Sequence, residues 1–546
     1  MKQTYSSVQA VLFVTTFFSC HLCVSWLDDS FSIVNSYSNS NANCLKQCNR
    51  MTDKLAKTRL QEAYSPDRLK SLGEYLIARL STHLTELQSR DHSVLNWNLP
   101  EENLPVAFDC LNNQNPDDDL LMRFQSLIET AIERGHNLHH PRYIGHQVPA
   151  SIPIAGLFDA LGSITNQVMA IYEMGPWATS VERALIERWG EIIGLKSGSF
   201  TGLVTHGGSL ANLTALLTAR NVSLENSWSK GMHKHSKPPV LLCQSDSHYC
   251  VTRSAGILGL GSEQVIKVPL DSQRKMDANA LEELLKDLRK SNTPIVAVCA
   301  SACATPIGAF DPLEEIADAC QRYDVWLHVD AAHGGAVSFS DKHRYLINGI
   351  TAADSFICDA HKTLFVPALC AFVFYRNKSH RFETFQQDAP YLFDPSAPGM
   401  ANIDSGMVTI ECTKRAATYG LWGVWSLFGP QIFGDMIDST FEMTRTLYEK
   451  LSDAEDFSPL HEPECNILVF RYIPPEKYGL DENQIGELNR KVRRHIIESG
   501  EFYIVQTNLD GIGALRVTVM NPLTEVEDLD RLLQSIRDTA LKILQT

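Results

Sequence analysis

The sequence is poor in the features that mark several simple classes of protein. It has no internal repeat and no long low-complexity run, which argues against a repeat array. It has no excess of basic residues, because 48 lysines and arginines stand against 64 aspartates and glutamates, a net charge of −16. This balance disfavours nonspecific binding to nucleic acid and adhesion to anionic membranes. We therefore expect a small-molecule partner, no nucleic acid and no membrane.

A zinc site is also disfavoured. Cys20-x-x-Cys23 and Cys44-x-x-x-Cys48 each offer two possible ligands, but the expected second pair of histidines or cysteines is absent. We predict no metal site. Fourteen cysteines would suffice for a disulfide framework, yet most lie singly in apolar, strand-like runs, which favours reduced core residues. Examples are Cys243, Cys299, Cys358 and Cys370.

The length and composition suit a large soluble enzyme. With 546 residues, 44% of them hydrophobic and 21% charged, the chain can bury a large core and form more than one domain. Between His140 and Tyr375, apolar runs alternate with helical stretches, which predicts an α/β fold with a mainly parallel sheet. The clearest runs are 295–298, 325–328 and 372–374, and the helices between them are 281–289 and 312–323.

Two motifs carry the chemistry at the expected strand ends. Asp330 stands in Leu327-His-Val-Asp-Ala-Ala-His333, and Lys362 stands in Cys358-Asp-Ala-His-Lys362. A buried aspartate can hold a pyridine nitrogen protonated, and a lysine can form a Schiff base with an aldehyde. Together they indicate an enzyme that uses pyridoxal 5'-phosphate.

A phosphate site is predicted upstream, in Thr205-His-Gly-Gly-Ser209 before an Ala/Leu-rich helix. Glycines let the backbone approach an anion, and free amides at a helix N-terminus would face the phosphate. His248 follows another apolar run, 240–243. It could lie over the pyridine ring and shuttle a proton, although a surface or capping role is the common alternative.

In these motifs the chain, from about His140 to about Pro522, resembles the group II pyridoxal-phosphate-dependent amino-acid decarboxylases. That family includes glutamate, aromatic-amino-acid, cysteine-sulfinate and diaminobutyrate decarboxylases. The resemblance implies a fold-type I transferase-like enzyme with a mainly parallel sheet flanked by helices. We predict a helical dimerisation segment over 51–135, a large cofactor domain over 136–420 and a small C-terminal α+β domain over 421–546. The implied assembly is a homodimer.

The resemblance also implies roles for single residues. Lys362 is similar to the Schiff-base lysine, Asp330 to the partner of the pyridine nitrogen and His248 to the ring-stacking histidine. Tyr391 is similar to the mobile-loop tyrosine that protonates the carbon left by carbon dioxide. The other residues similar to cofactor-binding positions are Gly208, Ser209, Thr305, Ala332 and His361. His333 and the segment 410–415 depart from the common pattern, and both could alter the substrate pocket.

The substrate is less well defined. Arg142 and Gln147 lie in a segment that resembles a substrate-side wall, and Arg516 resembles a carboxylate-binding arginine. Cations facing the substrate would suit an acidic amino acid, while overall likeness favours 2,4-diaminobutyrate, and aromatic amino acids come third. For Arg142 and Arg516 the alternatives are a surface salt bridge and a strand-edge charge. For His136, His139, His140 and His146 the alternative is a solvated polar stretch rather than a metal site.

Other outcomes stay open at this point. The same cofactor supports an aldehyde synthase or a carbon-carbon lyase, and a catalytically silent binding protein is a remote alternative. Retention of Lys362, Asp330 and His248 together argues against the silent protein.

The first fifty residues form a leader or a non-native extension. Lys2 and the apolar stretch from Val8 to Leu27 are similar to a signal peptide, whereas Met51 begins a charged, helix-like segment. The sequon Asn212-Leu-Thr214 would place a glycan on the proposed phosphate-binding helix. We therefore expect Met51 to be the true start and the protein to be cytoplasmic. A secreted or periplasmic protein is the alternative if the leader is genuine.

Overall fold

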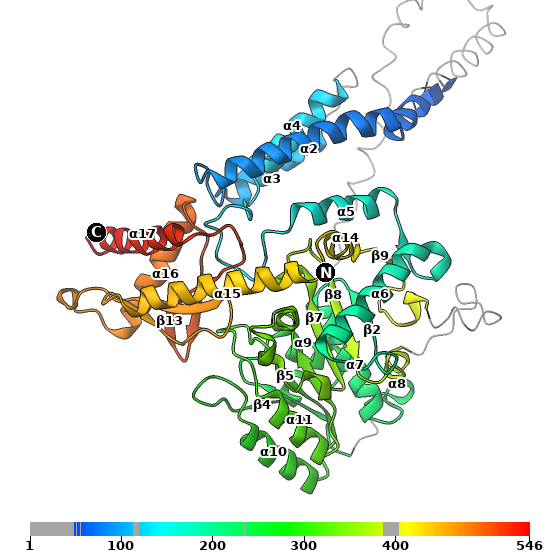
Figure 1. Cartoon of the computed structure of the whole chain (residues 1–546), viewed down its shortest axis with the longest axis vertical. Coiled ribbons are helices and arrows are strands. Elements are labelled where there is room, and N and C mark those ends of the chain that lie inside the picture. The colour runs from blue at the N-terminus through cyan, green and yellow to red at the C-terminus, as the bar shows by residue number, and fades with distance from the viewer. Residues whose placement is uncertain are drawn as a thin grey trace, which may run out of the picture. The chain divides into compact units, whose positions relative to one another are not determined.

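The computed structural model describes residues 49–545, apart from 51, 55, 113–118, 233–235 and 386–402. The chain divides into two compact units, residues 1–78 and 79–546. The described part of the first unit is helical, and helix α2 (Pro66–Gln88) runs across the boundary. Everything below concerns the second unit (Figure 1).

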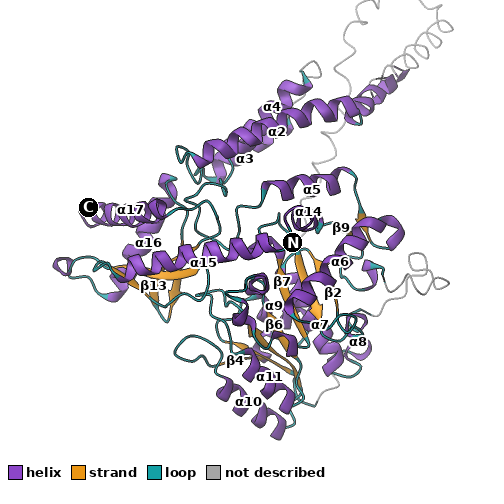
Figure 2. Ribbon diagram, in the orientation of Figure 1, coloured by secondary structure: helices purple, strands orange, loops and turns teal. Residues whose placement is uncertain are grey.

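A seven-stranded sheet forms the centre of this unit (Figure 2). Its strand order is β2, β8, β7, β6, β5, β3, β4; β8 is antiparallel to both of its neighbours, and the other pairs are parallel. This confirms the mainly parallel α/β sheet. The strands are β2 (Thr201–Thr205), β3 (Val240–Gln244), β4 (Val265–Val268), β5 (Ile295–Ser301), β6 (Leu327–Asp330), β7 (Ser355–Asp359) and β8 (Ala371–Tyr375).

Helices cover both faces of the sheet because its central strands are apolar on both sides. On one face, Ala215 of α7 packs in a core with Leu241 and Val373. On the other, Trp189 of α6 lies in a core with Ile316 of α11. The helices of the two faces are α7 (Gly208–Ser223) and α9 (Cys250–Ile257), and α6 (Pro176–Ile193), α10 (Ala278–Lys290), α11 (Leu313–Arg322) and α14 (Tyr419–Phe428). The predicted helices 281–289 and 312–323 are confirmed as α10 and α11.

A second sheet lies towards the C-terminus. It is antiparallel, in the order β10, β11, β13, β12, and has a core of its own around Phe470, Val492, Leu515 and Ile536. Its elements are β10 (Phe457–Pro459), β11 (Ile467–Tyr472), β12 (Val505–Leu509), β13 (Ile512–Thr518), α15 (Gln431–Ser452), α16 (Glu482–Ser499) and α17 (Val526–Gln545). The predicted mixture of long helices and a few strands in this region is confirmed, while the exact domain boundaries stay predictions.

Helices also precede the central sheet, as predicted. Those in the predicted segment 51–135 include α2, α3 (Pro100–Leu111) and α4 (Leu120–Glu133), while α5 (Pro153–Ile164) lies beyond it. A two-stranded ribbon pairs β1 (Val168–Met169) with β9 (Lys414–Arg415). Within the part of the chain that the structure describes, no helix is long and apolar enough to cross a membrane.

The cysteine prediction is also confirmed. Cys243, Cys299, Cys358 and Cys370 are buried free thiols in or beside the central strands. All ten cysteines among the described residues are free. The four N-terminal cysteines of the possible zinc motifs lie outside the described residues.

Candidate active site

The predicted site residues meet at the carboxyl ends of the parallel strands. Asp330 ends β6, Lys362 lies in the short helix α12 (Ala360–Thr363) directly after β7, and His248 follows β3. They line a cavity of about 680 Å³. The predicted residues that line this cavity are Gln147, Gly208, Ser209, His248, Thr305, Asp330, Ala332, His361 and Lys362.

The predicted phosphate turn lies between β2 and α7. Gly207 has a φ of 111°, in the region that favours glycine, and it caps the helix that starts at Gly208. The amides of Gly208 and Ser209 belong to the first helical turn, where no intrahelical acceptor exists. They can therefore bind an anion, and the helix dipole adds positive potential.

Close packing fixes one wall of this turn. A Cβ atom on Gly208 would lie 2.6 Å from Oδ2 of Asp359, the last residue of β7. Only glycine lets the turn and this carboxylate approach so closely. The turn thus packs against Asp359 only because Gly208 has no side chain.

Asp330 is held by two hydrogen bonds from the protein. Asn212 of α7 donates its side-chain amide to Oδ2 at 3.0 Å, and the backbone amide of Ala332 donates to Oδ1 at 3.2 Å. Both donors fix the orientation of the carboxylate. Asn212 is 1% exposed, so a glycan on the sequon is excluded in the folded protein.

The support for Asp330 continues as a directed chain of hydrogen bonds. Because Asn212 donates to Asp330, its Oδ1 must accept from Nε2 of His328, 2.8 Å away. Burial lowers the pKa of His328 to about 4, so the imidazole is neutral and its Nδ1 accepts from the hydroxyl of Ser355 at 2.9 Å. Ser355 in turn accepts from Trp326 Nε1 at 2.9 Å. Every polar atom in this buried chain has a partner, which fixes the orientation of Asp330.

His248 lies at the cavity wall after β3. Burial is the main cause of its lowered pKa, so the ring is neutral near pH 7. The amide of Cys250 donates to its Nδ1 at 3.3 Å, which leaves the proton on Nε2. The tilted ring of Tyr249 lies 4.1 Å away, centre to centre. His248 is thus positioned and able to donate one hydrogen bond within the cavity.

Lys362 is paired with an acid that the sequence analysis did not single out. Its Nζ lies 3.1 Å from Oδ2 of Asp359, whose side chain is only 1% exposed. Asp359 and Asp330 both raise the pKa of Lys362, against the opposing effect of burial. An ammonium group is therefore held in the cavity beside two carboxylates.

The two predicted substrate arginines do not line the cavity. Arg142 donates to Asp528 at 3.3 Å and lies over the ring of Phe502, so its charge is already paired. Its expected place at the substrate wall is not supported by this geometry. Arg516 is buried one layer behind the wall and donates to the backbone carbonyls of Thr305 and Pro306. Tyr391 lies outside the described residues.

The interpretation of the histidine cluster as a solvated stretch is wrong for His140. This residue is 1% exposed, and burial lowers its pKa to about 4, as it does for His136. No group of three or more metal-ligating side chains occurs among the residues that the structure describes. His146 is exposed and lines the cavity.

Further residues line or border the cavity although the sequence did not predict them as site residues. Asn212 and Cys303 line it, and so does His206, whose Nδ1 lies 3.2 Å from Glu411. His333, noted only as a departure, is neutral because burial lowers its pKa to about 3, and it bonds Asn466 at 2.8 Å. The position of His206 in the glycine-rich turn was the available signal. For Glu411 the signal was its place in the segment 410–415, which departs from the common pattern, although its pairing with His206 could not be seen from the sequence.

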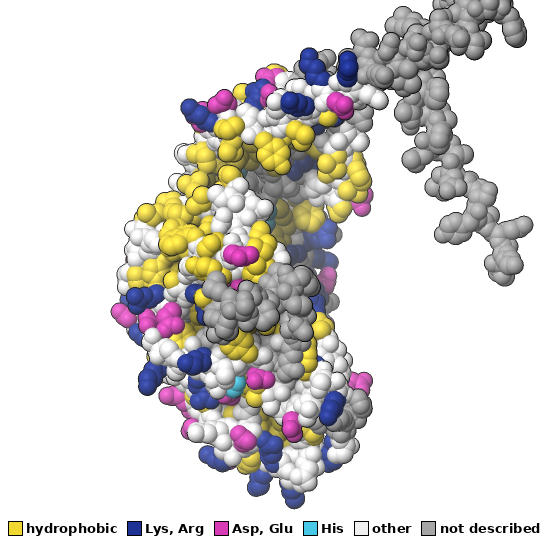
Figure 3. Space-filling model, turned by 90° about the vertical axis from the view of Figure 1, so that its right-hand side faces the viewer, with side chains coloured by type: hydrophobic (Ala, Val, Ile, Leu, Met, Phe, Trp, Pro, Cys, Tyr) yellow, Lys and Arg dark blue, Asp and Glu magenta, His cyan; other side chains and the backbone are white. Residues whose placement is uncertain are grey.

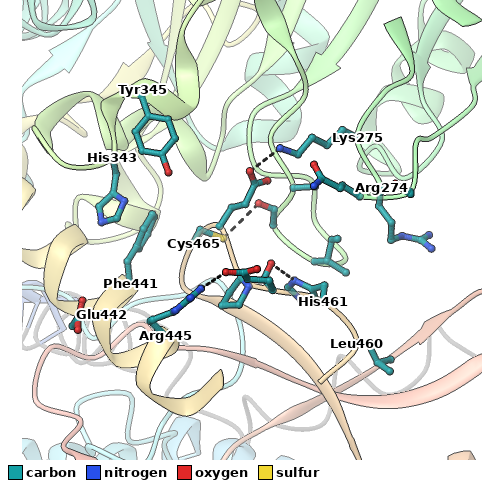
Figure 4. Close-up of a pocket in the computed structure, with 18 residues that line it drawn as sticks. Arg274, Lys275, His343, Tyr345, Phe441, Glu442, Arg445, Leu460, His461 and Cys465 are labelled. Carbon is teal, nitrogen blue, oxygen red and sulfur yellow. Dashed lines mark hydrogen bonds and ion pairs between the residues drawn. The ribbon is translucent and has the colours of Figure 1, made fainter. Parts of the chain in front are cut away.

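A second cavity of about 630 Å³ lies between the loop of Arg274 and Lys275 and helix α15 (Figure 4). Its cations are already paired: Arg274 with Asp246, Lys275 with Glu464 and Arg445 with Glu462. It lies away from the residues at the ends of β6 and β7. The first cavity is therefore the candidate active site.

The first cavity suits pyridoxal 5'-phosphate. It offers free amides for a phosphate, a lysine for an aldehyde and an oriented aspartate for a pyridine nitrogen. The volume also leaves room for an amino acid beside the cofactor. The fold and this set of side chains define the class of fold-type I pyridoxal-phosphate enzymes.

Comparison with known proteins makes the family explicit. Residues 100–473 match the pyridoxal-dependent decarboxylase conserved domain. The chain is 30% identical to the acidic amino acid decarboxylase GADL1 of Bos taurus over 455 residues, 82% of this chain and 86% of that protein. The chain therefore belongs to the pyridoxal-dependent decarboxylase family, and it is an amino-acid decarboxylase with pyridoxal phosphate as cofactor.

Solved structures agree with this conclusion. Mouse CSAD aligns with a TM-score of 0.78 at 27% identity, covering 87% of this chain and 99% of that one. Rice (Oryza sativa) TDC with PLP and tryptamine aligns with a TM-score of 0.79 at 19% identity, covering 88% and 99%, which shows the shared fold. The predicted fold, cofactor and reaction class are confirmed.

Proposed function

We propose that the substrate is an L-amino acid with an acidic side chain, which the enzyme converts to the amine and carbon dioxide. The carrying observation is the guanidinium group of Arg516, which is buried beside Thr305. It contacts carbonyl groups, and no carboxylate pairs with it among the described residues. A buried cation without an anion is costly, so the positive charge of Arg516, one layer behind this wall, would attract a substrate carboxylate that reaches the wall. GADL1, the relative named above, is an acidic amino acid decarboxylase.

The proposal for Arg516 is tested against Arg142. Arg516→Met should raise KM for acidic substrates about tenfold, which corresponds to about 1.4 kcal/mol, because the attraction between this buried cation and the substrate carboxylate is lost. Arg142→Met should leave KM within about threefold, because Arg142 is already neutralised by Asp528. Circular dichroism would verify that both variants are folded. Equal effects of the two substitutions on KM would contradict the proposal.

We propose a separate role for each residue of the cofactor site. The cofactor, when bound, accepts the electron pair released as carbon dioxide leaves. Lys362 is proposed to bind its aldehyde carbon, and Asp330 to hold the proton on its pyridine nitrogen. The amides of Gly208 and Ser209 are proposed to bind its phosphate. His248 holds a proton at the cavity wall. Thr305, Ala332 and His361 complete the proposed cofactor site, and Gln147 lies on the proposed substrate side.

Protonation of the substrate carbon is assigned to Tyr391 on family resemblance alone. This residue decides between an amine and an aldehyde product. Identifying the product of the wild type and of Tyr391→Phe by mass spectrometry would test the assignment. Aldehyde already formed by the wild type would favour the aldehyde-synthase alternative.

Two other substrate classes remain as alternatives. 2,4-Diaminobutyrate would bring a second ammonium group, whereas in the cavity Asp330 already accepts a hydrogen bond from Asn212 and Asp359 is already paired with Lys362. Aromatic substrates would leave Arg516 without an anion. The bacterial decarboxylase domain of Vibrio parahaemolyticus and the plant enzymes are under 25% identical, and their likeness concerns the fold.

We also propose a cytoplasmic homodimer. Large hydrophobic side chains are exposed on α3 and α5, including Leu104, Phe108, Leu157 and Leu161. Figure 3 shows hydrophobic side chains gathered over much of one face. Such contiguous patches are typical of protein–protein interfaces. The free thiols among the described cysteines suit a reducing compartment.

A further inference from the structure

We infer that Asp359 is a positioning residue for Lys362: its carboxylate holds the amino group of this lysine whenever the lysine is not bonded to the cofactor. The inference rests on the proposed role of Lys362. Asp359 ends β7, and Lys362 lies three residues later in α12. The two side chains form an ion pair of 3.1 Å inside the cavity.

The carboxylate of Asp359 has no other strong polar interaction with the described residues. Neither of its carboxylate oxygens accepts a well-aligned hydrogen bond from the described residues. His361 lies further away, with Nε2 3.7 Å from Oδ2. Asp330, by contrast, is engaged by Asn212 and by the amide of Ala332. Of the two carboxylates, Asp359 is therefore the one that can pair with the Lys362 ammonium group without giving up another hydrogen bond.

Three other titratable groups that face Lys362 are neutral near pH 7 and add no charge beside its ammonium group. Burial lowers the pKa of His248 and of His333 and raises that of Cys303 well above its usual range, so all three are neutral. The titratable groups around the lysine, from all packed elements, are Asp330, Asp359, His248, His333, His361, Cys250 and Cys303. The ammonium group is thus stabilised by Asp330 and Asp359.

This arrangement has a consequence for each turnover. If the substrate amine took the place of Lys362 on the aldehyde carbon, one carbon–nitrogen bond would form and another would break. The substrate nitrogen would give up two protons and the departing lysine nitrogen would gain two, so that the lysine would leave as an ammonium group and the exchange would balance. Asp359 would then hold the lysine inside the cavity, with Nζ about 3.1 Å from Oδ2 as in the ion pair described above. For the return, the lysine must lose this proton, because only the free amine attacks.

The carboxylate also borders the phosphate turn, since Oδ2 lies within 2.6 Å of a Cβ position on Gly208. Asp359 could therefore act on the phosphate by repulsion instead of on the lysine. Pyridoxal separates the two effects, because it carries the aldehyde and lacks the phosphate. An effect through the lysine must appear with both aldehydes.

The test uses the full chain freed of cofactor. The rate of lysine loading, followed by its visible absorbance, is measured against pH with pyridoxal 5'-phosphate and with pyridoxal. In Asp359→Asn the midpoint of this profile should fall by about one pH unit with both aldehydes, because one neighbouring anion is lost. Loading at neutral pH should then be about tenfold faster. Asp341→Asn, which removes a charge at a side chain 94% exposed, should match the wild type.

Two results would overturn the inference. An unchanged profile would mean that Asp359 does not hold the lysine, and a change confined to pyridoxal 5'-phosphate would reassign it to the phosphate turn. If Asp359→Asn does not fold, Asp359→Ser removes the same charge with less bulk. Borohydride reduction and peptide mapping separately test Lys362: an adduct that persists in Lys362→Ala would refute the proposed role of the lysine, not the pairing.

Discussion

The residue with the most elaborate support is Asp330, whose position depends on side chains from α7, β6 and β7. Asn212 links it to His328, Ser355 and Trp326 in one directed chain of hydrogen bonds. A pyridine nitrogen keeps its proton only if the carboxylate beside it is ionised and correctly aimed. The chain of hydrogen bonds fixes the direction in which the carboxylate points.

Asn212→Leu tests this support at the scale of one residue. The substitution has a similar volume but removes one of the two hydrogen-bond partners of Asp330 and one of the two partners of His328. We expect about 2 kcal/mol lower stability and at least tenfold weaker binding of pyridoxal 5'-phosphate. Urea unfolding and equilibrium dialysis would measure the two effects. Asn377→Leu, at an exposed turn, serves as the control, and unchanged cofactor affinity in Asn212→Leu would contradict the account.

His328 also predicts a pH dependence of stability. Its pKa is about 4 in the folded protein against about 6.5 in an unfolded chain. Between these values only the unfolded chain binds the proton, so this contribution to stability is lost as the pH falls from 6.5 towards 4.

In His328→Gln the plot of unfolding free energy against pH should therefore be shallower by ~1 kcal/mol per pH unit between about pH 5 and 6. Urea titrations at several pH values would measure this slope. His495→Gln, at an exposed site on α16, should keep the wild-type slope. A slope unaltered by the His328 change would mean that this histidine is protonated in the folded protein.

Sequence reasoning at this scale found Lys362, Asp330 and His248 because each follows an apolar run that ends at one sheet edge. It missed Asn212, which was considered only as a sequon, because its function depends on α7 lying across the end of β6. It treated Arg142 as a candidate substrate ligand because Asp528, 386 positions away, could not be seen as its partner. Contacts between distant segments thus account for both differences.

At the scale of elements, the turn between β2 and α7 depends on tight packing. Gly208→Ala would bring a methyl group against the Asp359 carboxylate, 2.6 Å from Oδ2. We expect at least tenfold weaker binding of pyridoxal 5'-phosphate, since either the turn or the carboxylate must move. Gly156→Ala in α5, with open space around it, should bind the cofactor normally. Equal affinities measured by fluorescence titration would show that the turn does not need the glycine.

The ribbon strand β9 is joined to α6 and β2 by a buried ion pair. Lys414 donates to both oxygens of Glu182 and to the carbonyl of Val204. Lys414→Met should cost ~3–5 kcal/mol of stability, because a buried carboxylate is left without its cation. The double variant Lys414→Met with Glu182→Leu should recover more than half of this loss. A double variant as unstable as the single one would contradict the argument.

The long elements were predictable because their apolar runs repeat over several residues, as in β5 and β8. The ribbon of β1 and β9 was not, since two residues carry no periodic signal. The pairing of strands in the sheet could also not be predicted from local sequence patterns. Strand β8 lies antiparallel between β2 and β7, and its direction depends on the path of the connecting segments and not on the residues of the strand itself.

At the scale of the whole molecule, the exposed apolar side of α3 supports the proposed homodimer. Leu104, Phe108 and Leu111 lie on one side of this helix and are more than half exposed. Phe108→Glu should shift the enzyme towards monomers at low concentration, because a charge there would be desolvated in the interface. Sedimentation velocity would measure the shift, with Leu541→Glu in α17 as control. A wild type that is monomeric at all concentrations would exclude the dimer.

The central claim is that this chain removes carbon dioxide from acidic L-amino acids through Lys362. The most direct test is release of labelled carbon dioxide by the full chain with pyridoxal 5'-phosphate, from glutamate, aspartate, cysteine sulfinate, 2,4-diaminobutyrate, ornithine, lysine and aromatic amino acids. We predict release from at least one acidic substrate, little from the basic and aromatic ones, and none in Lys362→Ala. Release from a basic or aromatic substrate alone, or release that persists in Lys362→Ala, would contradict the claim.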